Sequence, residues 1–215
     1  MGKLLARCGE GLEDMDIYGI LAEYSVYHTP DYVYIKGKGE LLFEDDPDSV
    51  INLSCLKQGI GLAGEDVGKV RIRKNSGIKK ILTIENLTTF FRWKEKDSLM
   101  IYLGGYHNSV RRKLLELLHQ SFPEAEYLHF GDIDVGGFEI YRDLCRKTGI
   151  PFKTYHMGIE ELEKYKSCTQ KLTEGDCKRL EVLIKKIESE GGDTRVLQYM
   201  KEKGRKLEQE GIEQT

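Results

Sequence analysis

The chain has 215 residues, of which 40% are hydrophobic and 32% are charged, so it can bury one or two ordinary globular cores. It contains no run of about 18 apolar residues and no long apolar region near its start, so we expect a cytoplasmic protein without a membrane span. Its five cysteines include no Cys-x-x-Cys pair, which argues against a disulfide framework or a structural zinc site.

Charge is distributed unevenly along the chain, although the net charge is only −3. Residues Lys69 to Lys113 include twelve Lys or Arg and three acids, whereas Gly9 to Ser49 include two Lys and eleven acids. A single charge run usually does no more than solvate an exposed face. Here the basic run surrounds Glu85, where acids alone would repel DNA, and this indicates a phosphate-facing surface.

The predicted elements begin with a small α+β appendage over residues 1–75. Its elements are a helical pattern at 15–22, strand-like runs at 32–35 and 41–43, and a glycine-rich stretch at 59–68. Over 76–157, strands and helices alternate, which predicts an α/β core with a mostly parallel sheet. Four strands are expected at 79–84, 99–103, 127–130 and 152–155, with helices near 87–93, from about 109 and at 138–147 on both faces. Residues 158–215 are expected to form a helical extension of the same domain, ending in a polar helix toward Gln214.

Three carboxylates follow two of these predicted strands. Glu85 ends the run at 81–84, and Asp132 and Asp134 come directly after the strand at 127–130. Parallel sheets bind ligands at the carboxyl ends of their strands, so the three acids are expected at one edge. Because converging acids repel one another at neutral pH, a hard divalent cation is the natural occupant. We therefore expect a magnesium site, with Mn²⁺ as a possible substitute, for phosphoryl transfer or nuclease chemistry.

Other interpretations of these motifs are weaker. Gly59 to Gly64 matches the dinucleotide fingerprint, and Glu85 lies near the expected place of a ribose-binding acid. However, polar residues precede the first glycine where a buried strand should end, so we expect no nucleotide cofactor. An aspartyl phosphatase would carry its Asp-x-Asp on the first strand, where this chain has Glu85. Asn86 and Asp134 are also residue types that commonly cap helices.

The residues around the acids resemble a known domain. Glu85-Asn86 after one strand, Gly131-Asp132-Ile133-Asp134 after another, and Gly136-Gly137 opening a helix resemble the Toprim domain of topoisomerases, primases and the topoisomerase VI A subunit. The strings at 83–90, 104–106, 129–134 and 207–210 resemble, more closely, the JetD family of Wadjet anti-plasmid nuclease subunits, over most of the chain from about residue 15. Those relatives carry proline where this chain has Val135, and they are longer, with an amino-terminal winged helix.

This resemblance implies a Toprim-type fold and Mg²⁺-dependent DNA cleavage. Asp132 and Asp134 would be the principal metal ligands, Glu85 would share a metal or act as general acid or base, and Asn86 would orient Glu85 or a water. The resemblance also implies a homodimer and an SMC-like motor complex that delivers DNA. Glu208 and Glu210 would ordinarily lie on a polar helix surface, but the resemblance suggests that they pack back toward the metal site and support its ligands.

Arg111, Arg112 and Lys113 near the start of a helix are candidate phosphate contacts, although a solvated face explains them nearly as well. Two alternatives to a metal-dependent nuclease stay open. One is a non-catalytic module that binds DNA or a partner. The other is a topoisomerase-like tyrosine transesterase, but the amino-terminal tyrosines, including Tyr32 and Tyr34, lie in patterns that packing explains. Hydrolysis by water is therefore the expected mechanism.

Overall fold

The computed structural model describes residues 21, 24–26, 30–46, 48–106 and 108–213. It divides into two compact units, Met1–Asp31 and Tyr32–Thr215. The helical pattern predicted at 15–22 falls almost entirely outside the described residues. The second unit carries the elements discussed below, and none of the helices in the described part of the chain is both long and apolar enough to cross a membrane.

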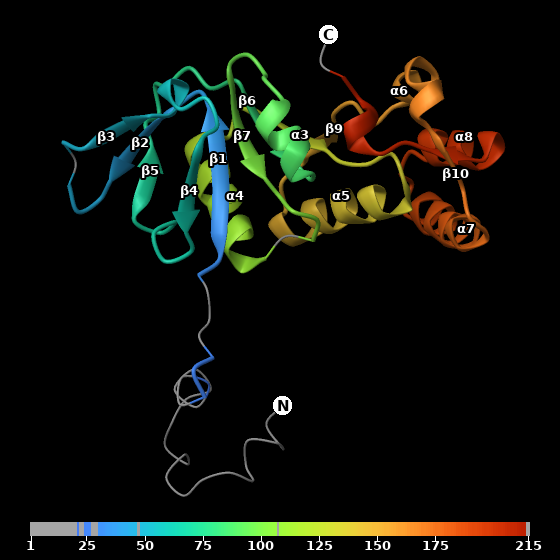
Figure 1. Cartoon of the computed structure of the whole chain (residues 1–215), viewed down its shortest axis with the longest axis horizontal. Coiled ribbons are helices and arrows are strands. Elements are labelled where there is room, and N and C mark those ends of the chain that lie inside the picture. Colours follow the sequence, from blue (N-terminus) through green and yellow to red (C-terminus); the bar gives the residue numbers. More distant parts are fainter. Residues whose placement is uncertain (1–20, 22–23, 27–29, 47, 107, 214–215) are drawn as a thin grey trace, which may run out of the picture. The chain divides into compact units, whose positions relative to one another are not determined.

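A six-stranded mixed sheet forms the centre of this unit (Figure 1). Its strands, in spatial order, are β4 (Ile60–Ala63), β1 (Tyr32–Gly37), β7 (Ser98–Tyr102), β6 (Lys80–Ile84), β8 (Glu126–Phe130) and β9 (Lys153–Thr154). The last four run parallel, which confirms the mostly parallel α/β prediction. The first two are antiparallel additions, so the sheet has six strands rather than the expected four. They join because Val33 and Ile35 on β1 are fully or almost fully buried and belong to the core that β7 also lines.

The remaining strands near the amino-terminal end make a small antiparallel sheet. Its strands are β2 (Glu40–Phe43), β3 (Val50–Asn52) and β5 (Val70–Ile72), and a short 3₁₀ turn η1 (Leu53–Cys55) follows β3. The glycine-rich motif at 59–64 lies in and around β4, where Gly61 pairs with Tyr34 of β1. A dinucleotide fingerprint needs a tight turn between a strand and a helix at that point, so the structure excludes that interpretation.

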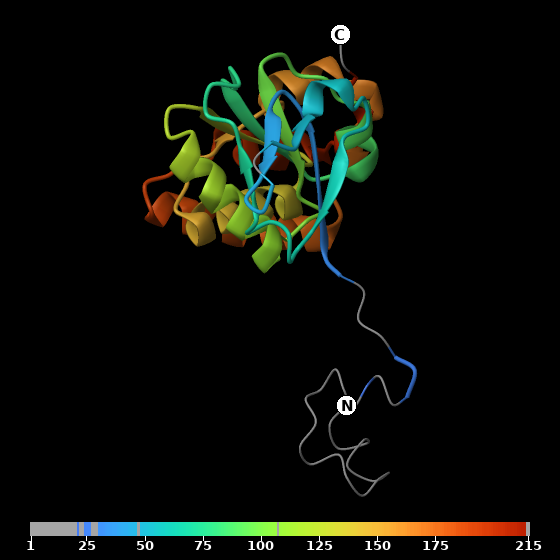
Figure 2. The same ribbon diagram turned by 90° about the vertical axis from the view of Figure 1, so that its left-hand side faces the viewer.

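Helices cover both faces of the sheet (Figures 1 and 2). They are α3 (Leu87–Arg92), α4 (Ser109–Ser121) and α5 (Val135–Thr148). Successive residues of β6 point to opposite sides, so Ile81 joins the core beneath α4 whereas Leu82 and Ile84 join the core that holds Phe90 of α3. This two-sided burial explains why the central strands read as continuous apolar runs.

The carboxy-terminal extension is only partly helical. Its elements are α6 (Ile159–Lys164), η2 (Lys166–Cys168), β10 (Gln170–Lys171), α7 (Glu174–Ser189), α8 (Arg195–Lys203), β11 (Arg205–Lys206) and η3 (Gln209–Gly211). The predicted polar helix toward Gln214 is wrong for the described residues after 203. Gly204 takes a left-handed backbone with φ of 65° and ends α8. Beyond it the chain runs extended as far as Glu208 and then forms the short turn η3, and Leu207, Gln209 and Ile212 are buried.

Candidate metal centre

Parallel pairing of β6 and β8 brings the predicted acids to one edge of the sheet. Ile84 pairs with Phe130, and the Glu85 N–H donates to the Phe130 carbonyl at 3.0 Å. Glu85 therefore stands beside Gly131 and Asp132, which follow β8. The Gly104 N–H at the end of β7 donates to the Glu85 carbonyl at 3.2 Å, which ties the third strand end to the same place.

Gly131 permits the close approach of these acids. A Cβ atom at this buried position would lie 2.7 Å from Oε2 of Glu85. That oxygen is buried and has no hydrogen-bond partner. A buried carboxylate oxygen without a donor is costly, and in native proteins such atoms call for a ligand or another explanation.

Asp134 and Asn86 both cap helices. Oδ1 of Asp134 accepts the Gly137 N–H at 2.7 Å as the N-cap of α5, and Oδ1 of Asn86 accepts the Thr89 N–H at 2.9 Å as the N-cap of α3. The capping interpretation therefore holds for both residues, without excluding a second role. Val135 begins α5 and is buried, directly after the Asp134 cap.

The carboxy-terminal segment adds two further carboxylates. Leu207 forms an antiparallel bridge with Ile133, with N–H to carbonyl distances of 2.8 and 3.1 Å in the two directions. This bridge lies between Asp132 and Asp134 in sequence and brings Glu208 and Glu210 to the sheet edge. In the described part of the chain, oxygens of Asp132, Glu208 and Glu210 lie within 4.8 Å of one another and could hold a metal ion. The expected trio of Glu85, Asp132 and Asp134 is not such a close group.

The electrostatics of the cluster reflect burial and mutual repulsion. The pKa of Glu85 is raised to about 7, first by burial and then by the charges of Asp132, Asp134 and Glu208, while a hydrogen bond from the Asp132 main chain opposes the shift. The pKa of Asp132 is likewise raised to about 6, mainly by burial and also by Glu208, Asp134 and Glu210, while the Gln209 N–H opposes the shift. Positive charge entering the site would favour the ionised form of both carboxyl groups.

These donors fit a hard divalent cation. All are carboxylate oxygens, which Mg²⁺, Mn²⁺ and Ca²⁺ prefer over the softer ligands that zinc selects. The partnerless Oε2 of Glu85 lies beside Gly131, the residue directly before Asp132. The arrangement is therefore chemically suited to a cation that compensates several negative charges.

The candidate DNA-contacting residues lie at the start of α4, next to the end of β7. Arg111 is partly engaged already: its guanidinium packs over the Tyr102 ring at 5.6 Å and donates to the Tyr32 carbonyl at 3.4 Å. Arg112 lies 3.9 Å from Glu116 on the same helix. Lys113 is exposed, with its amino group beside Gly68. Only part of this basic group is thus available for phosphate.

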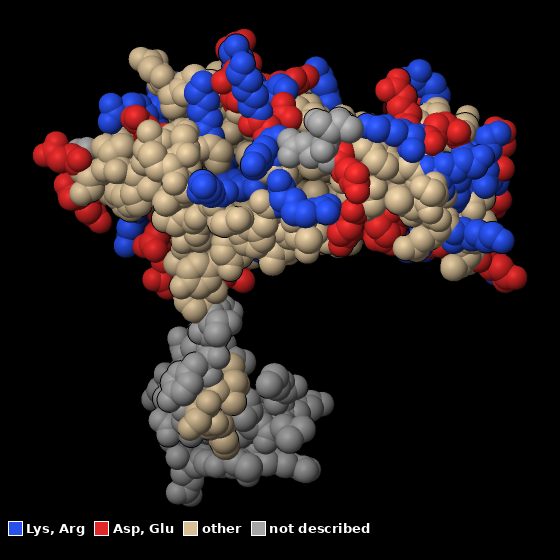
Figure 3. All heavy atoms as spheres, turned by 45° about the horizontal axis from the view of Figure 1, so that its top comes forward, with Lys and Arg blue, Asp and Glu red and all other residues tan. Residues whose placement is uncertain are grey.

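The fold also cancels part of the charge asymmetry seen along the sequence. Arg71 and Arg73 from the basic stretch pair with Glu44 and Glu40 from the acidic stretch, at 2.5 and 2.8 Å. These pairs form because β5 is hydrogen-bonded to β2. In Figure 3, Lys and Arg side chains accordingly lie in separate groups with acidic and uncharged atoms between them, not in one continuous basic surface.

Packing accounts for Tyr32 and Tyr34 only in part, against the interpretation of the sequence pattern. Both lie on the exposed side of β1, and 47% and 36% of their surfaces remain accessible. The Tyr34 ring contacts Phe91 and Tyr102, with centroid separations of 6.2 and 6.1 Å. An aromatic surface therefore flanks the end of β7, next to the acid cluster.

Gln209 is the residue that sequence reasoning missed. It is fully buried, its main-chain N–H donates to Oδ1 of Asp132 at 2.7 Å, and its side chain bonds main-chain atoms of Asn86 and Phe130. The available signal was the Leu207-Glu208-Gln209-Glu210 string itself, because an apolar residue and an amide alternating with acids indicates an extended segment with one buried side.

The fold and the cluster define an α/β domain with an acidic, cation-suited centre at the carboxyl edge of a mostly parallel sheet. A family model described as "Wadjet protein JetD, C-terminal" matches residues 45–215, and the chain belongs to this family. The resemblance to JetD is thereby confirmed. A curated relative, the Wadjet protein JetD of Bacillus cereus (strain Q1), is 28% identical over 163 residues, which cover 74% of this chain. The match covers 38% of that relative, so the chain spans about two fifths of its length.

Proposed function

We propose that this chain is a Mg²⁺-dependent DNA endonuclease domain of the Toprim type, acting as the DNA-cleaving part of a Wadjet-type plasmid defence system. The observation that carries the proposal is the carboxylate cluster at the sheet edge: Asp132, Glu208 and Glu210 converge there, beside a buried Glu85 oxygen without a hydrogen-bond donor. Membership of the JetD family supplies the biological setting.

Each acid has a proposed role. Asp132 is the central ligand, because its carboxylate belongs to the close group and also stands between Glu85 and the carboxy-terminal segment. Asp134 and Glu85 complete the ligand set from the strand ends, while Glu208 and Glu210 are direct ligands rather than distant supports. Bound Mg²⁺, for which Mn²⁺ can substitute, supplies the charge that compensates the scissile phosphate and the leaving oxygen. Glu85 also holds or accepts a proton near neutral pH.

Asn86 has a positioning role in this scheme. Its amide nitrogen donates to Oε1 of Glu210, and its main chain is bonded to Gln209, so it connects the end of β6 to the carboxy-terminal acids. The proposed DNA contacts are Arg111, Arg112 and Lys113. Of these, Arg111 packs over the Tyr102 ring, which also contacts Tyr34, so it is the one that would hold a phosphate nearest the end of β7.

The partners are proposed from the family alone. A homodimer would provide two centres for two DNA strands, and an SMC-like motor complex would deliver the DNA. The dinucleotide interpretation is withdrawn on structural grounds, so no nucleotide cofactor is proposed.

The test of the proposal combines cation binding with cleavage. We expect the 215-residue chain to bind Mg²⁺ or Mn²⁺ and to nick or linearise plasmid DNA only when the cation is present. Glu85→Ala should abolish cleavage while the fold and DNA binding are retained. The matched control is Glu139→Gln, an acid on α5 that pairs with Arg179 at 2.6 Å instead of entering the cluster. A chain that neither binds these cations nor cleaves DNA contradicts the proposal.

The nucleophile is tested separately. Tyr34 and Tyr106 are exposed, so either hydroxyl group could reach DNA if the enzyme were a tyrosine transesterase. We propose that water is the attacking group, so rapid denaturation of a cleavage reaction should release DNA ends free of protein. A protein–DNA adduct mapped to either tyrosine would replace hydrolysis by transesterification.

A further inference from the structure

Gln209 makes three hydrogen bonds that meet at the acid cluster, although none of its own atoms is acidic. Its main-chain N–H donates to Oδ1 of Asp132 at 2.7 Å, and its Nε2 donates to the Phe130 carbonyl at 2.8 Å. Its Oε1 accepts the Asn86 N–H at 2.8 Å. The side chain is fully buried, so both ends of the amide are used where water is excluded.

These three partners belong to separate parts of the chain. Phe130 ends β8, Asn86 follows β6, and Asp132 belongs to the candidate cation site, whereas Gln209 lies 77 to 123 residues away from them along the sequence. A carboxylate at this position would face the Phe130 carbonyl without a donor. An apolar side chain would leave the Asn86 N–H unpaired and the Phe130 carbonyl with the Glu85 N–H as its single donor. An amide is the side chain that satisfies both groups with no added charge.

The buried amide also sets the direction of its acidic neighbours. Glu208 has extended backbone angles, so consecutive side chains point to opposite sides there. With Leu207 and Gln209 buried, Glu208 is directed to the side where its carboxylate meets Asp132. Glu210 is held by the Asn86 side chain, and its main-chain carbonyl accepts from Arg92 at 3.2 Å.

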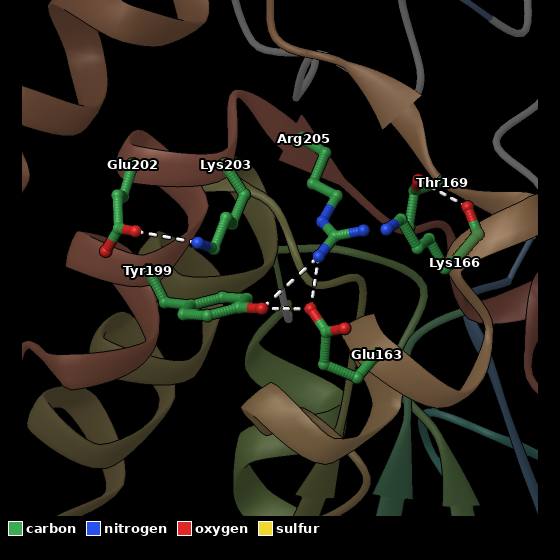
Figure 4. Close-up of polar contacts among 7 residues, drawn as sticks. All are labelled: Glu163, Lys166, Thr169, Tyr199, Glu202, Lys203 and Arg205. Carbon is green, nitrogen blue, oxygen red and sulfur yellow. Dashed lines mark hydrogen bonds and ion pairs between the residues drawn. The ribbon is translucent and has the colours of Figure 1, made fainter.

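Residues 207–210 follow directly after a part of the chain that is held by the side chain of Arg205. Figure 4 shows Arg205 of β11 bonded to Glu163 of α6 and to Tyr199 of α8, and Arg205 is itself buried. This cluster fixes the chain only three residues before Glu208. However, the Arg205 contacts do not involve Asp132, Glu208 or Glu210. Repulsion among these three carboxylates therefore still acts against docking of residues 207–210. The Gln209 bonds oppose this repulsion at the cluster itself, together with the contacts of Asn86 and Arg92 to Glu210 and the Leu207–Ile133 bridge.

We propose that Gln209 is a positioning residue for the metal centre, which fixes Glu208 and Glu210 against the two strand ends so that all the carboxylates address one cation. This inference rests on the proposed function. The metal centre is then formed by two parts of the chain, the strand ends and residues 207–210. Docking of residues 207–210 and cation binding favour each other, because a cation relieves the repulsion that docking creates.

The test compares Gln209→Leu with Gln198→Leu in the full chain. Gln198 is an exposed amide on α8 that donates to Glu188 and Thr194, so the same substitution also removes two hydrogen bonds there, away from the acids. We expect Gln209→Leu to weaken Mn²⁺ binding, measured by titration calorimetry and by the electron paramagnetic resonance signal of free Mn²⁺, about 10- to 100-fold. Gln198→Leu should bind as wild type does. In Gln209→Leu, saturating Mn²⁺ should restore most of the cleavage rate. The variant would therefore differ from wild type mainly in the Mn²⁺ concentration that it needs.

Two further measurements distinguish a positioning role of Gln209 from a contribution to folding stability alone. Ile184→Val removes a methyl group from the core of α7 and should lower thermal stability without changing Mn²⁺ affinity. In wild type, Mn²⁺ should slow amide hydrogen exchange over residues 205–212, and this protection should disappear in Gln209→Leu. If Gln209→Leu does not fold, the shorter amide in Gln209→Asn, which cannot span both partners, is expected to show the same loss of affinity.

The outcomes are distinct. Unchanged Mn²⁺ affinity in a folded Gln209 variant overturns the positioning role and leaves the proposed function standing. Absence of Mn²⁺ binding in wild type overturns both. Weaker binding with lost exchange protection, while Gln198→Leu and Ile184→Val bind normally, supports the inference.

Discussion

The acids of the candidate centre reach it by two different routes. Glu85, Asp132 and Asp134 stand directly after strands, where hydrogen bonding between β6 and β8 fixes their backbone to within a residue. Glu208 and Glu210 arrive on an extended segment that is held by a bridge to Ile133 and by Gln209. The first route is built into the sheet, whereas the second depends on a few long-range hydrogen bonds and on the burial of Leu207 and Ile212 in the core that α3 also lines.

The largest effect is expected where the two routes meet. Asp132→Asn removes the charge shared by both sets, so stabilisation by Mg²⁺ should be lost and cleavage should fall by about a thousandfold or more. Differential scanning fluorimetry with and without Mg²⁺, together with a plasmid cleavage assay, measures both. Asp193→Asn, at an exposed acid paired with Arg195, is the control. If Mg²⁺ stabilises Asp132→Asn as much as wild type, the centre does not include Asp132.

Neutralising one acid from each route tests whether both routes contribute to metal binding. Glu208→Gln and Asp134→Asn should each weaken Mn²⁺ binding by roughly 10- to 100-fold, with little change in the stability of the metal-free protein, because asparagine still caps α5. Asp134→Ala should in addition lose about 1 kcal/mol of stability with the cap. Calorimetric titration and urea unfolding give the two quantities. Equal metal affinity in Glu208→Gln and wild type would restrict the centre to the strand ends.

Gly131→Ala disturbs the strand-end route alone. The new Cβ atom would meet Oε2 of Glu85 at 2.7 Å and the His129 ring at 2.9 Å, so the side chains must shift. We expect the free energy of unfolding of Gly131→Ala to fall by about 1–3 kcal/mol, which corresponds to a fall of roughly 2–12 °C in Tm for a domain of this size. Gly149→Ala is an unsuitable control because its φ is 68°, whereas Gly175→Ala in α7 meets nothing closer than 3.7 Å. Full stability in Gly131→Ala would mean that Glu85 has room to move.

The smallest expected effect is a pH dependence of the metal-free protein. The pKa of Glu85 is raised from 4.5 to about 7, so the folded state binds this proton more tightly than the unfolded state does. The corresponding stability is complete below about pH 4.5 and is lost as pH rises toward 7, and Asp132 acts in the same direction up to about pH 6. Thermal unfolding in EDTA from pH 5 to 8 should show a decline in Tm that is smaller in Glu85→Gln. Solvent screening of these half-buried groups keeps the decline to a few degrees. An identical decline in both proteins would assign it to other groups.

Much of the parallel core followed from local patterns. Strands such as β6 and β8 are buried on both faces, so they read as apolar runs, and the acids that follow them could be assigned to one edge because parallel strands end together. The helix-capping roles of Asn86 and Asp134 also follow from residue type and position. The sequence by itself therefore determined the α/β class, the position of Glu85, Asp132 and Asp134, and, through its characteristic strings, the family.

Tertiary structure decided what depends on partners distant in the chain. The addition of β1 and β4 to the sheet, the pairing of Arg71 and Arg73 with the acidic stretch, and the exposure of Tyr34 all depend on which edges meet, and hydrophobic periodicity does not encode this. The carboxy-terminal string is the clearest case. By composition, residues after 203 resemble a polar helix, but Gly204 ends α8 and the bonds of Gln209 to Phe130 and Asn86 hold the segment extended on the sheet edge. Because those bonds cross 79 and 123 residues, only the folded chain brings Glu208 and Glu210 to Asp132.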